Sequence, residues 1–222
     1  TLPEIIKQCR IISGKDLDIA MTTNAALLES KLEELVNAGL SRANISFHSI
    51  DDKKYQQFTG SKTKVEDIKR IIHKSKEAGL GIKINSVVIR GFNDMDIPKM
   101  ANFCFNEGVI PRFLELGIYG PVAQWYTEKD QVPHKEILKI MEDNFGKFER
   151  DMTYRGNGPS KYYKNEKGQI FGILDNQSDK LCRGCDRFRM SANGYIKVCN
   201  FNPIDLRPYL KSDEELKEQL LI

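Results

Sequence analysis

Three cysteines near the C-terminal end of the chain have the spacing of a metal-binding site. Cys182 and Cys185 form a C-x2-C pair, and Cys199 follows after thirteen intervening residues. A C-x2-C pair places two thiolates on one tight turn, where both can bind the same metal centre. The dipeptide Asn193-Gly194 predicts a β-hairpin with a type I′ turn, which would bring Cys199 back beside the pair.

Two kinds of metal centre fit these cysteines. Three thiolates are one fewer than a closed zinc site requires, so zinc would need a remote fourth ligand. Three cysteines can also hold a cubane iron–sulfur cluster and leave one iron open to a substrate atom. The spacing alone leaves both alternatives open. Cys9 and Cys104 lie at helical core spacing, so we expect them to be buried and not to bind metal.

Composition limits the class of protein. The chain has 222 residues, 29% of them charged, and a formal net charge of +3. That modest charge is not clustered and argues against a nucleic-acid-binding protein. We find no signal peptide and no apolar run long enough to cross a membrane, and we expect a cytoplasmic protein with reduced cysteines. The chain begins at Thr1 and ends within a predicted helix, so we expect both ends to be cut.

Hydrophobic periodicity predicts alternating strands and helices. Predicted helices cover residues 1–10, 28–38, 63–78 and 97–104, with one more after Pro133, and capping boxes are expected at Thr1 and Thr63. Predicted strands cover residues 18–23, 42–48, 82–89, 112–118, 148–154, 161–163 and 169–174. The first four strands alternate with helices, which is typical of a parallel sheet in an α/β barrel or a doubly wound fold. The last three strands are expected to be antiparallel.

The first four strands each have one apolar and one polar or small face. Thr22 and Lys83 lie on the polar faces of their strands, and on the fourth strand we expect Glu115 and Gly117 there, opposite Leu114 and Leu116. A closed eight-stranded barrel fills its interior with Val, Ile and Leu. Polar inner faces therefore favour an interior that holds a polar ligand.

Several stretches together resemble one family, the GTP 3′,8-cyclases (the MoaA family) of radical S-adenosylmethionine enzymes. The cysteine hairpin with Arg187 and Arg189 is the most specific of them. The others would be weak alone, but they occur in the family's order over nearly the whole chain: Thr22–Ala25, Asn44–Ser46, Lys83–Asp94 and Arg112–Glu115.

The resemblance implies a fold and a division of the chain. Residues 1–120 would form part of an incomplete TIM-like α/β barrel of the radical SAM type. Residues 121–222 would form an α+β C-terminal region that carries an auxiliary iron–sulfur cluster and binds substrate. The family's CxxxCxxC motif, which holds a second [4Fe-4S] cluster, would precede this chain.

The resemblance also implies an activity in molybdenum cofactor biosynthesis. The N-terminal cluster would reduce S-adenosylmethionine to a 5′-deoxyadenosyl radical that abstracts the ribose 3′-hydrogen of GTP, before ring closure at C8 by a lyase-type enzyme. A [4Fe-4S] cluster on Cys182, Cys185 and Cys199 would bind the guanine base. We expect this chain alone to be inactive, and the family's tendency to dimerise implies a homodimer.

Individual residues carry over from the family motifs. GTP would contact Thr22, Lys83, Arg187 and Arg189, and S-adenosylmethionine would contact Ser46 and Gly117; no side chain is assigned a catalytic role. Independently, period two in the hairpin places both arginines on one face, and Arg and Lys are the residues that bind oligophosphates.

Four positions depart from the family: Ala25 for Gly, His48 for Asp, Gly117 for Met and Asp186 for Asn. They leave room for a divergent substrate, and Ala25 is expected to reshape its loop, where the family's Gly tolerates positive φ. Two other functions therefore stay open. One is a radical SAM enzyme with an auxiliary cluster acting on a peptide or another small molecule. The other is a zinc-stabilised binding domain without redox chemistry.

Overall fold

The structure is a computed structural model that describes residues 1–14, 16–153, 160–175, 189–197, 204–209, Ser212 and Glu214. It divides the chain into two compact units, Thr1–Lys180 and Leu181–Ile222, which we describe separately. The division predicted near residue 120 remains a prediction.

The first unit contains a seven-stranded sheet in the order β1-β2-β3-β4-β7-β6-β5. Five strands run parallel: β1 (Ala20–Thr23), β2 (Arg42–Ser46), β3 (Gly81–Val88), β4 (Ile110–Glu115) and β7 (Ile170–Leu174). Two antiparallel strands complete the edge, β6 (Lys161–Asn165) and β5 (Phe148–Arg150). The predicted α/β fold with a mostly parallel sheet is confirmed.

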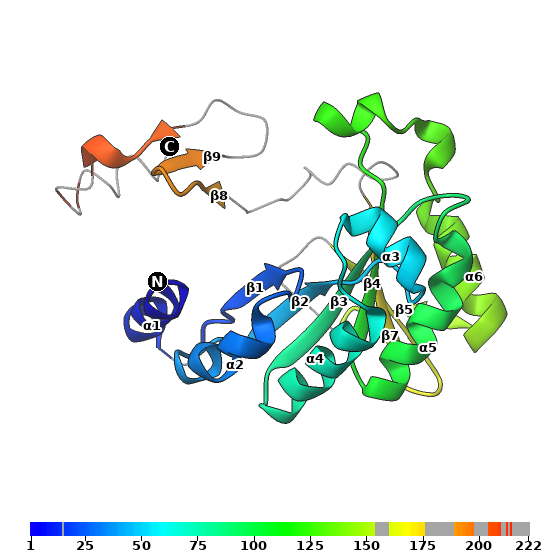
Figure 1. Cartoon of the computed structure of the whole chain (residues 1–222), viewed down its shortest axis with the longest axis horizontal. Helices are drawn as coiled ribbons and strands as arrows, with labels where there is room; N and C mark the ends of the chain where they lie inside the picture. Colours follow the sequence, from blue (N-terminus) through cyan, green and yellow to red (C-terminus); the bar gives the residue numbers. More distant parts are fainter. Residues whose placement is uncertain are drawn as a thin grey trace. The chain divides into compact units, whose positions relative to one another are not determined.

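In the described part of the first unit, six α-helices accompany this sheet, and Figure 1 shows α2, α4 and α5 along one of its faces. The helices are α1 (Leu2–Ser13), α2 (Leu28–Asn37), α3 (Asp52–Thr59), α4 (Val65–Glu77), α5 (Ile97–Glu107) and α6 (His134–Phe145). Short 3-10 helices cover Asp94–Asp96, Gly120–Gln124 and Glu128–Asp130, and another in the second unit covers Arg207–Tyr209. Burial of the apolar helix and strand faces against each other makes one continuous core.

Helix α4 shows how side-chain spacing fixes the local structure. Its residues at spacings of three and four are buried, and the chain ends the helix before Gly79, whose φ is +80°. The predicted capping boxes at Thr1 and Thr63 are absent. Instead the carboxylate of Asp52, in α3, accepts a hydrogen bond of 2.7 Å from the amide of Val65 and caps α4 from another helix.

Three features differ from the sequence prediction. Helix α3 was not predicted, because it is short and buries only one side chain, Tyr55. Cys9 is exposed, since it lies on the outer side of α1, whereas Cys104 is buried as expected. Strand β4 begins at Ile110 and carries Pro111 within it, so it starts two residues earlier than predicted.

The loop after β1 holds an alanine in the left-handed backbone conformation. Ala25 is fully buried and has a φ of +65°, the only positive φ among the non-glycine residues that the structure describes. Its amide donates a 3.0 Å hydrogen bond to the hydroxyl of Thr23. The methyl group therefore fits and the residue bears the strain of the left-handed conformation, whereas reshaping of this loop relative to the family stays a prediction.

Candidate functional site

The inner face of the sheet, opposite the helices, carries the polar residues predicted for a ligand. Parallel pairing aligns Thr22 with Asn44 and Asn44 with Lys83, so these three side chains form one row across β1, β2 and β3. Thr22 is exposed, whereas Lys83 is only 5% exposed. The register thus brings two of the predicted GTP contacts onto one face of the sheet.

A second row lies one step closer to the carboxyl ends of the strands. Ser46 aligns with Asn85 and Asn85 with Arg112. The side-chain oxygen of Asn85 is buried and accepts no hydrogen bond from the residues that the structure describes. Arg112 was not among the predicted site residues, although its alternation with Pro111 and Phe113 would have indicated the inner face.

The fourth strand corrects the predicted assignment of faces. Leu114 pairs with Val87 and with Leu174 on the inner face, whereas Glu115 pairs with Val88 on the helix side. Glu115 is 2% exposed, and its carboxylate accepts a 2.7 Å hydrogen bond from the amide of His134 at the start of α6. The carboxylate of Glu115 therefore caps a helix, although the residue is among those that line the cavity described below.

Lys83 has an aromatic partner from the distant antiparallel part of the sheet. Its ammonium group donates a 3.0 Å hydrogen bond to the phenol oxygen of Tyr162, which lies on the inner face of β6. Arg112 approaches the same phenol and helps to lower its pKa. The inner face therefore concentrates two cations at one point, as recognition of an anionic ligand requires.

A cavity of about 750 Å³ opens at the carboxyl ends of β3 and β4. Its lining includes Val87, Leu114, Gly117 and Tyr119, so the predicted S-adenosylmethionine contact at Gly117 faces a real cavity; Ser46 is not among its described lining residues. A side chain at position 117 would have its Cβ only 2.5 Å from a ring carbon of Tyr119. Glycine here, in place of the family's methionine, makes room for that ring.

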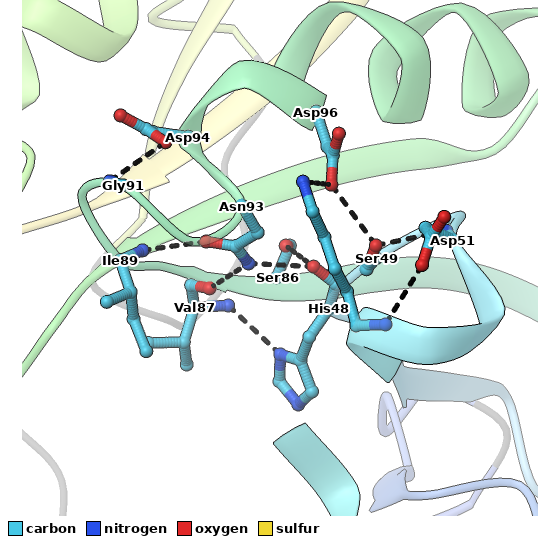
Figure 2. Close-up of polar contacts among 11 residues, drawn as sticks. His48, Ser49, Asp51, Ser86, Val87, Ile89, Gly91, Asn93, Asp94 and Asp96 are labelled. Carbon is cyan, nitrogen blue, oxygen red and sulfur yellow. Dashed lines mark hydrogen bonds and ion pairs between the residues drawn. The ribbon is translucent and has the colours of Figure 1, made fainter. Parts of the chain in front are cut away.

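A network of hydrogen bonds fixes the chain beside this cavity (Figure 2). The side-chain amide of Asn93 donates to the carbonyl oxygens of His48, at 2.7 Å, and Val87, at 2.8 Å. Its oxygen accepts a 2.8 Å hydrogen bond from the amide of Ile89. Asn93 is 3% exposed, so one side chain satisfies three backbone groups where pairing between β2 and β3 ends.

The imidazole of His48 belongs to the same network. Its Nδ1 accepts a 3.2 Å hydrogen bond from the amide of Val87, and its ring packs on that of Phe58 with centroids 4.2 Å apart. Burial lowers the pKa of His48 to about 4. Where the family usually has a carboxylate, this chain therefore has a neutral side chain at physiological pH.

The second unit contains the predicted hairpin, with a different turn. Strands β8 (Arg189–Met190) and β9 (Tyr195–Lys197) pair antiparallel, and β10 (Ile204–Asp205) pairs with β9. Only Gly194 has a positive φ in the turn, and the amide of Ser191 donates to the carbonyl of Tyr195. The connection is a three-residue loop and not the expected type I′ turn.

Most of the predicted metal-binding stretch lies outside the residues that the structure describes. Cys182, Cys185, Arg187 and Cys199 lie outside the described residues, whereas Arg189 is described and exposed. In the described part of the chain, no group of three or more His, Cys, Asp and Glu residues could hold a metal ion. Within the same part, no helix is long and apolar enough to cross a membrane.

Known proteins resemble the chain over almost its full length. Residues 1–104 match the Radical SAM superfamily, and residues 110–222 match the family Molybdenum Cofactor Synthesis C. A GTP 3′,8-cyclase of Aquifex aeolicus is 36% identical over 98% of this chain and 67% of its own length. One from Syntrophomonas wolfei is 33% identical over 98% of this chain and 68% of its length. The chain thus spans about two thirds of these relatives.

Solved structures resemble the fold at lower identity. Streptococcus suis SuiB bound to S-adenosylmethionine aligns with a TM-score of 0.63 and 13% identity, covering 96% of this chain and 50% of SuiB. A domain of a pyruvate-formate lyase-activating enzyme from Bacteroides vulgatus aligns with a TM-score of 0.50 and 21% identity, covering 64% of this chain and 81% of that domain.

The sheet, the cavity at its carboxyl ends and the match over residues 1–104 define the class of protein: a radical SAM enzyme, which uses S-adenosylmethionine and an iron–sulfur cluster. Within that class, the identity to curated relatives and the match over residues 110–222 are decisive. The chain belongs to the GTP 3′,8-cyclase family of molybdenum cofactor biosynthesis.

Proposed function

We propose that this chain supplies the GTP-binding part of a GTP 3′,8-cyclase, a lyase-type enzyme that forms the cyclic 3′,8 intermediate of the molybdenum cofactor. The observation that carries the proposal is a pair of cations on the inner face of the sheet, the buried Lys83 and the half-buried Arg112, which both approach the phenol oxygen of Tyr162. Two cations directed toward one point can donate charge-assisted hydrogen bonds to the polyphosphate of a nucleotide.

The remaining predicted contacts complete this proposal. Thr22 lies in the same row as Lys83 and would bind the nucleotide through its hydroxyl. Arg187 and Arg189 would add cations from the cysteine hairpin. S-adenosylmethionine would bind at Ser46 and in the cavity beside Gly117, whose volume accommodates a ligand of that size.

The cysteines would hold an iron–sulfur cluster. Cys182, Cys185 and Cys199 supply three soft thiolate ligands, which suit iron in a cubane cluster. When bound, that cluster supplies an open iron for the substrate base, and the chain's own residues hold the phosphates. We further propose that the enzyme is cytoplasmic and dimeric, binds neither nucleic acid nor membrane, and that residues 1–222 alone do not turn GTP over.

Equilibrium binding of GTP tests the nucleotide site. Lys83→Ala should weaken GTP binding at least tenfold, because a hydrogen bond to a charged group contributes about 1.5–3 kcal/mol. Lys31→Ala is the matched control: it removes the same charge from an exposed residue of α2 that pairs with Glu34. Equal affinities of wild type and Lys83→Ala would contradict the proposal.

Metal analysis tests the cluster. After reconstitution without oxygen, we expect about four iron and four sulfide per chain, and loss of both in Cys182→Ala. The buried Cys104 allows the control substitution Cys104→Ala, which should leave the iron content unchanged. About one zinc and no sulfide, with a known cluster protein reconstituted in parallel, would instead indicate a structural zinc site.

A further inference from the structure

Tyr162 lies at the centre of the inner-face cation pair, although no family motif assigned it a role. It is 3% exposed, and its phenol oxygen accepts the 3.0 Å hydrogen bond from Lys83. The ammonium nitrogen also lies 5.0 Å from the centroid of the Tyr162 ring. Tyr162 thus contacts the Lys83 ammonium group with both its aromatic ring and its hydroxyl group.

The phenol oxygen lies in the field of both cations. Burial by itself raises the pKa of Tyr162, but the hydrogen bond and charge of Lys83, together with Arg112, outweigh burial and bring this pKa below its ordinary value. Two like charges repel at short distance, most strongly in a buried environment. The phenol oxygen, with its partial negative charge, offsets part of that repulsion.

The sheet is shaped to let Tyr162 and Arg112 approach each other. Both residues pair with Gly172, so the three form one row across β4, β7 and β6. A Cβ at position 172 would lie 3.0 Å from a ring carbon of Tyr162 and 3.1 Å from Cγ of Arg112. The missing side chain of Gly172 therefore leaves space that the tyrosine ring and the arginine side chain both use.

We propose that Tyr162 is a positioning residue that holds Lys83 and Arg112 toward one point, where together they bind the polyphosphate group of the nucleotide. This inference rests on the proposed function and adds a residue to it. Because both cations are held before the ligand arrives, binding loses less side-chain entropy and the positive charge is preorganised.

The test is Tyr162→Phe in the reconstituted chain, with GTP, guanosine and inorganic triphosphate as separate ligands. The variant keeps the ring over Gly172 and removes one oxygen atom, so it should fold. We expect GTP and triphosphate to bind about tenfold more weakly, and guanosine to bind as in the wild type. Thermal unfolding of each variant verifies folding.

Tyr163→Phe is the matched control, because it makes the same change at the next residue on the opposite face. The Tyr163 hydroxyl contacts Nε2 of His134 at 2.6 Å, on the helix side of the sheet. GTP affinity should not change in this variant.

The outcomes separate this inference from the proposed function. If Lys83→Ala weakens GTP binding but Tyr162→Phe does not, the positioning role is overturned and the nucleotide site stands. If neither substitution weakens binding, the proposed function fails. If Tyr162→Phe weakens guanosine as much as GTP, the tyrosine has a general structural role and the inference is overturned.

Discussion

Substitution of Asn93 should show how strongly one side chain holds the carboxyl ends of β2 and β3. Asn93→Ala removes three hydrogen bonds to the backbone of His48, Val87 and Ile89 and leaves those groups buried. Each such bond contributes about 1 kcal/mol net, so unfolding free energy should fall by about 3 kcal/mol.

Asn93→Asp should reveal the direction of the hydrogen bonds. The aspartate can still accept from Ile89, but its second oxygen would face the carbonyl oxygens of His48 and Val87. The charged form is disfavoured there, so the folded-state pKa of this carboxyl rises above its unfolded value of about 3.9. The variant therefore keeps most stability below pH 4 and loses it as pH rises through the folded-state pKa.

Urea unfolding at pH 5 and pH 8 measures this effect. Relative to wild type, Asn93→Asp should lose more stability at pH 8 than at pH 5, and at pH 8 the loss should exceed the roughly 3 kcal/mol of the alanine variant. Asn102→Asp, on the exposed side of α5, adds the same charge and serves as control. A smaller loss at pH 8 than at pH 5, or losses under about 1 kcal/mol in both variants, would refute the reasoning.

Two further predictions concern positions where the chain departs from its family. Ala25→Val should reduce the free energy of unfolding by about 3 kcal/mol or more, because a branched side chain is strained at positive φ and has no space there. Ala25→Gly should change the free energy of unfolding by less than about 1 kcal/mol, since relief of backbone strain offsets the lost methyl group. Equal effects of the two substitutions in urea unfolding would contradict this prediction. His48, followed by its NMR resonances, should titrate near pH 4. Because the unfolded chain takes up that proton near pH 6.5, His48 should reduce stability as pH falls from about 6.5 to about 4, and a titration midpoint at 6.5 or above would show that burial has no such effect.

Sequence periodicity was sufficient for most of the fold. Helices α4 and α5, in which apolar residues recur at intervals of three and four residues, were predicted at nearly the right residues. Helix α3 was not predicted because it is short and mostly polar. Its N-cap is Asp51, and aspartate is as common in turns as at the starts of helices, so it did not indicate a helix. Spacing locates an element when its buried face is wide, and fails when few side chains are buried.

The site was harder to predict than the fold. Alternation placed Thr22 and Lys83 correctly, but Glu115 on the wrong face, because a buried glutamate that caps a distant helix looks like an inner-face polar residue. No sequence pattern indicated a role for Tyr162, because its contact with Lys83 depends on the register of strands that are far apart in sequence. Pairing between distant strands is set by packing, which one sequence does not display.

The place of β7 between β4 and β6 also has a consequence for folding. Strands β1 to β4 each join a neighbour one βα unit away, whereas Lys83 and Tyr162 are separated by 79 positions. Closing long loops is entropically costly, so we expect the antiparallel strands to dock late. The Lys83 and Arg112 side chains would then meet the Tyr162 phenol only at the final step of folding. A folding intermediate with most of its secondary structure would therefore lack a preorganised phosphate site.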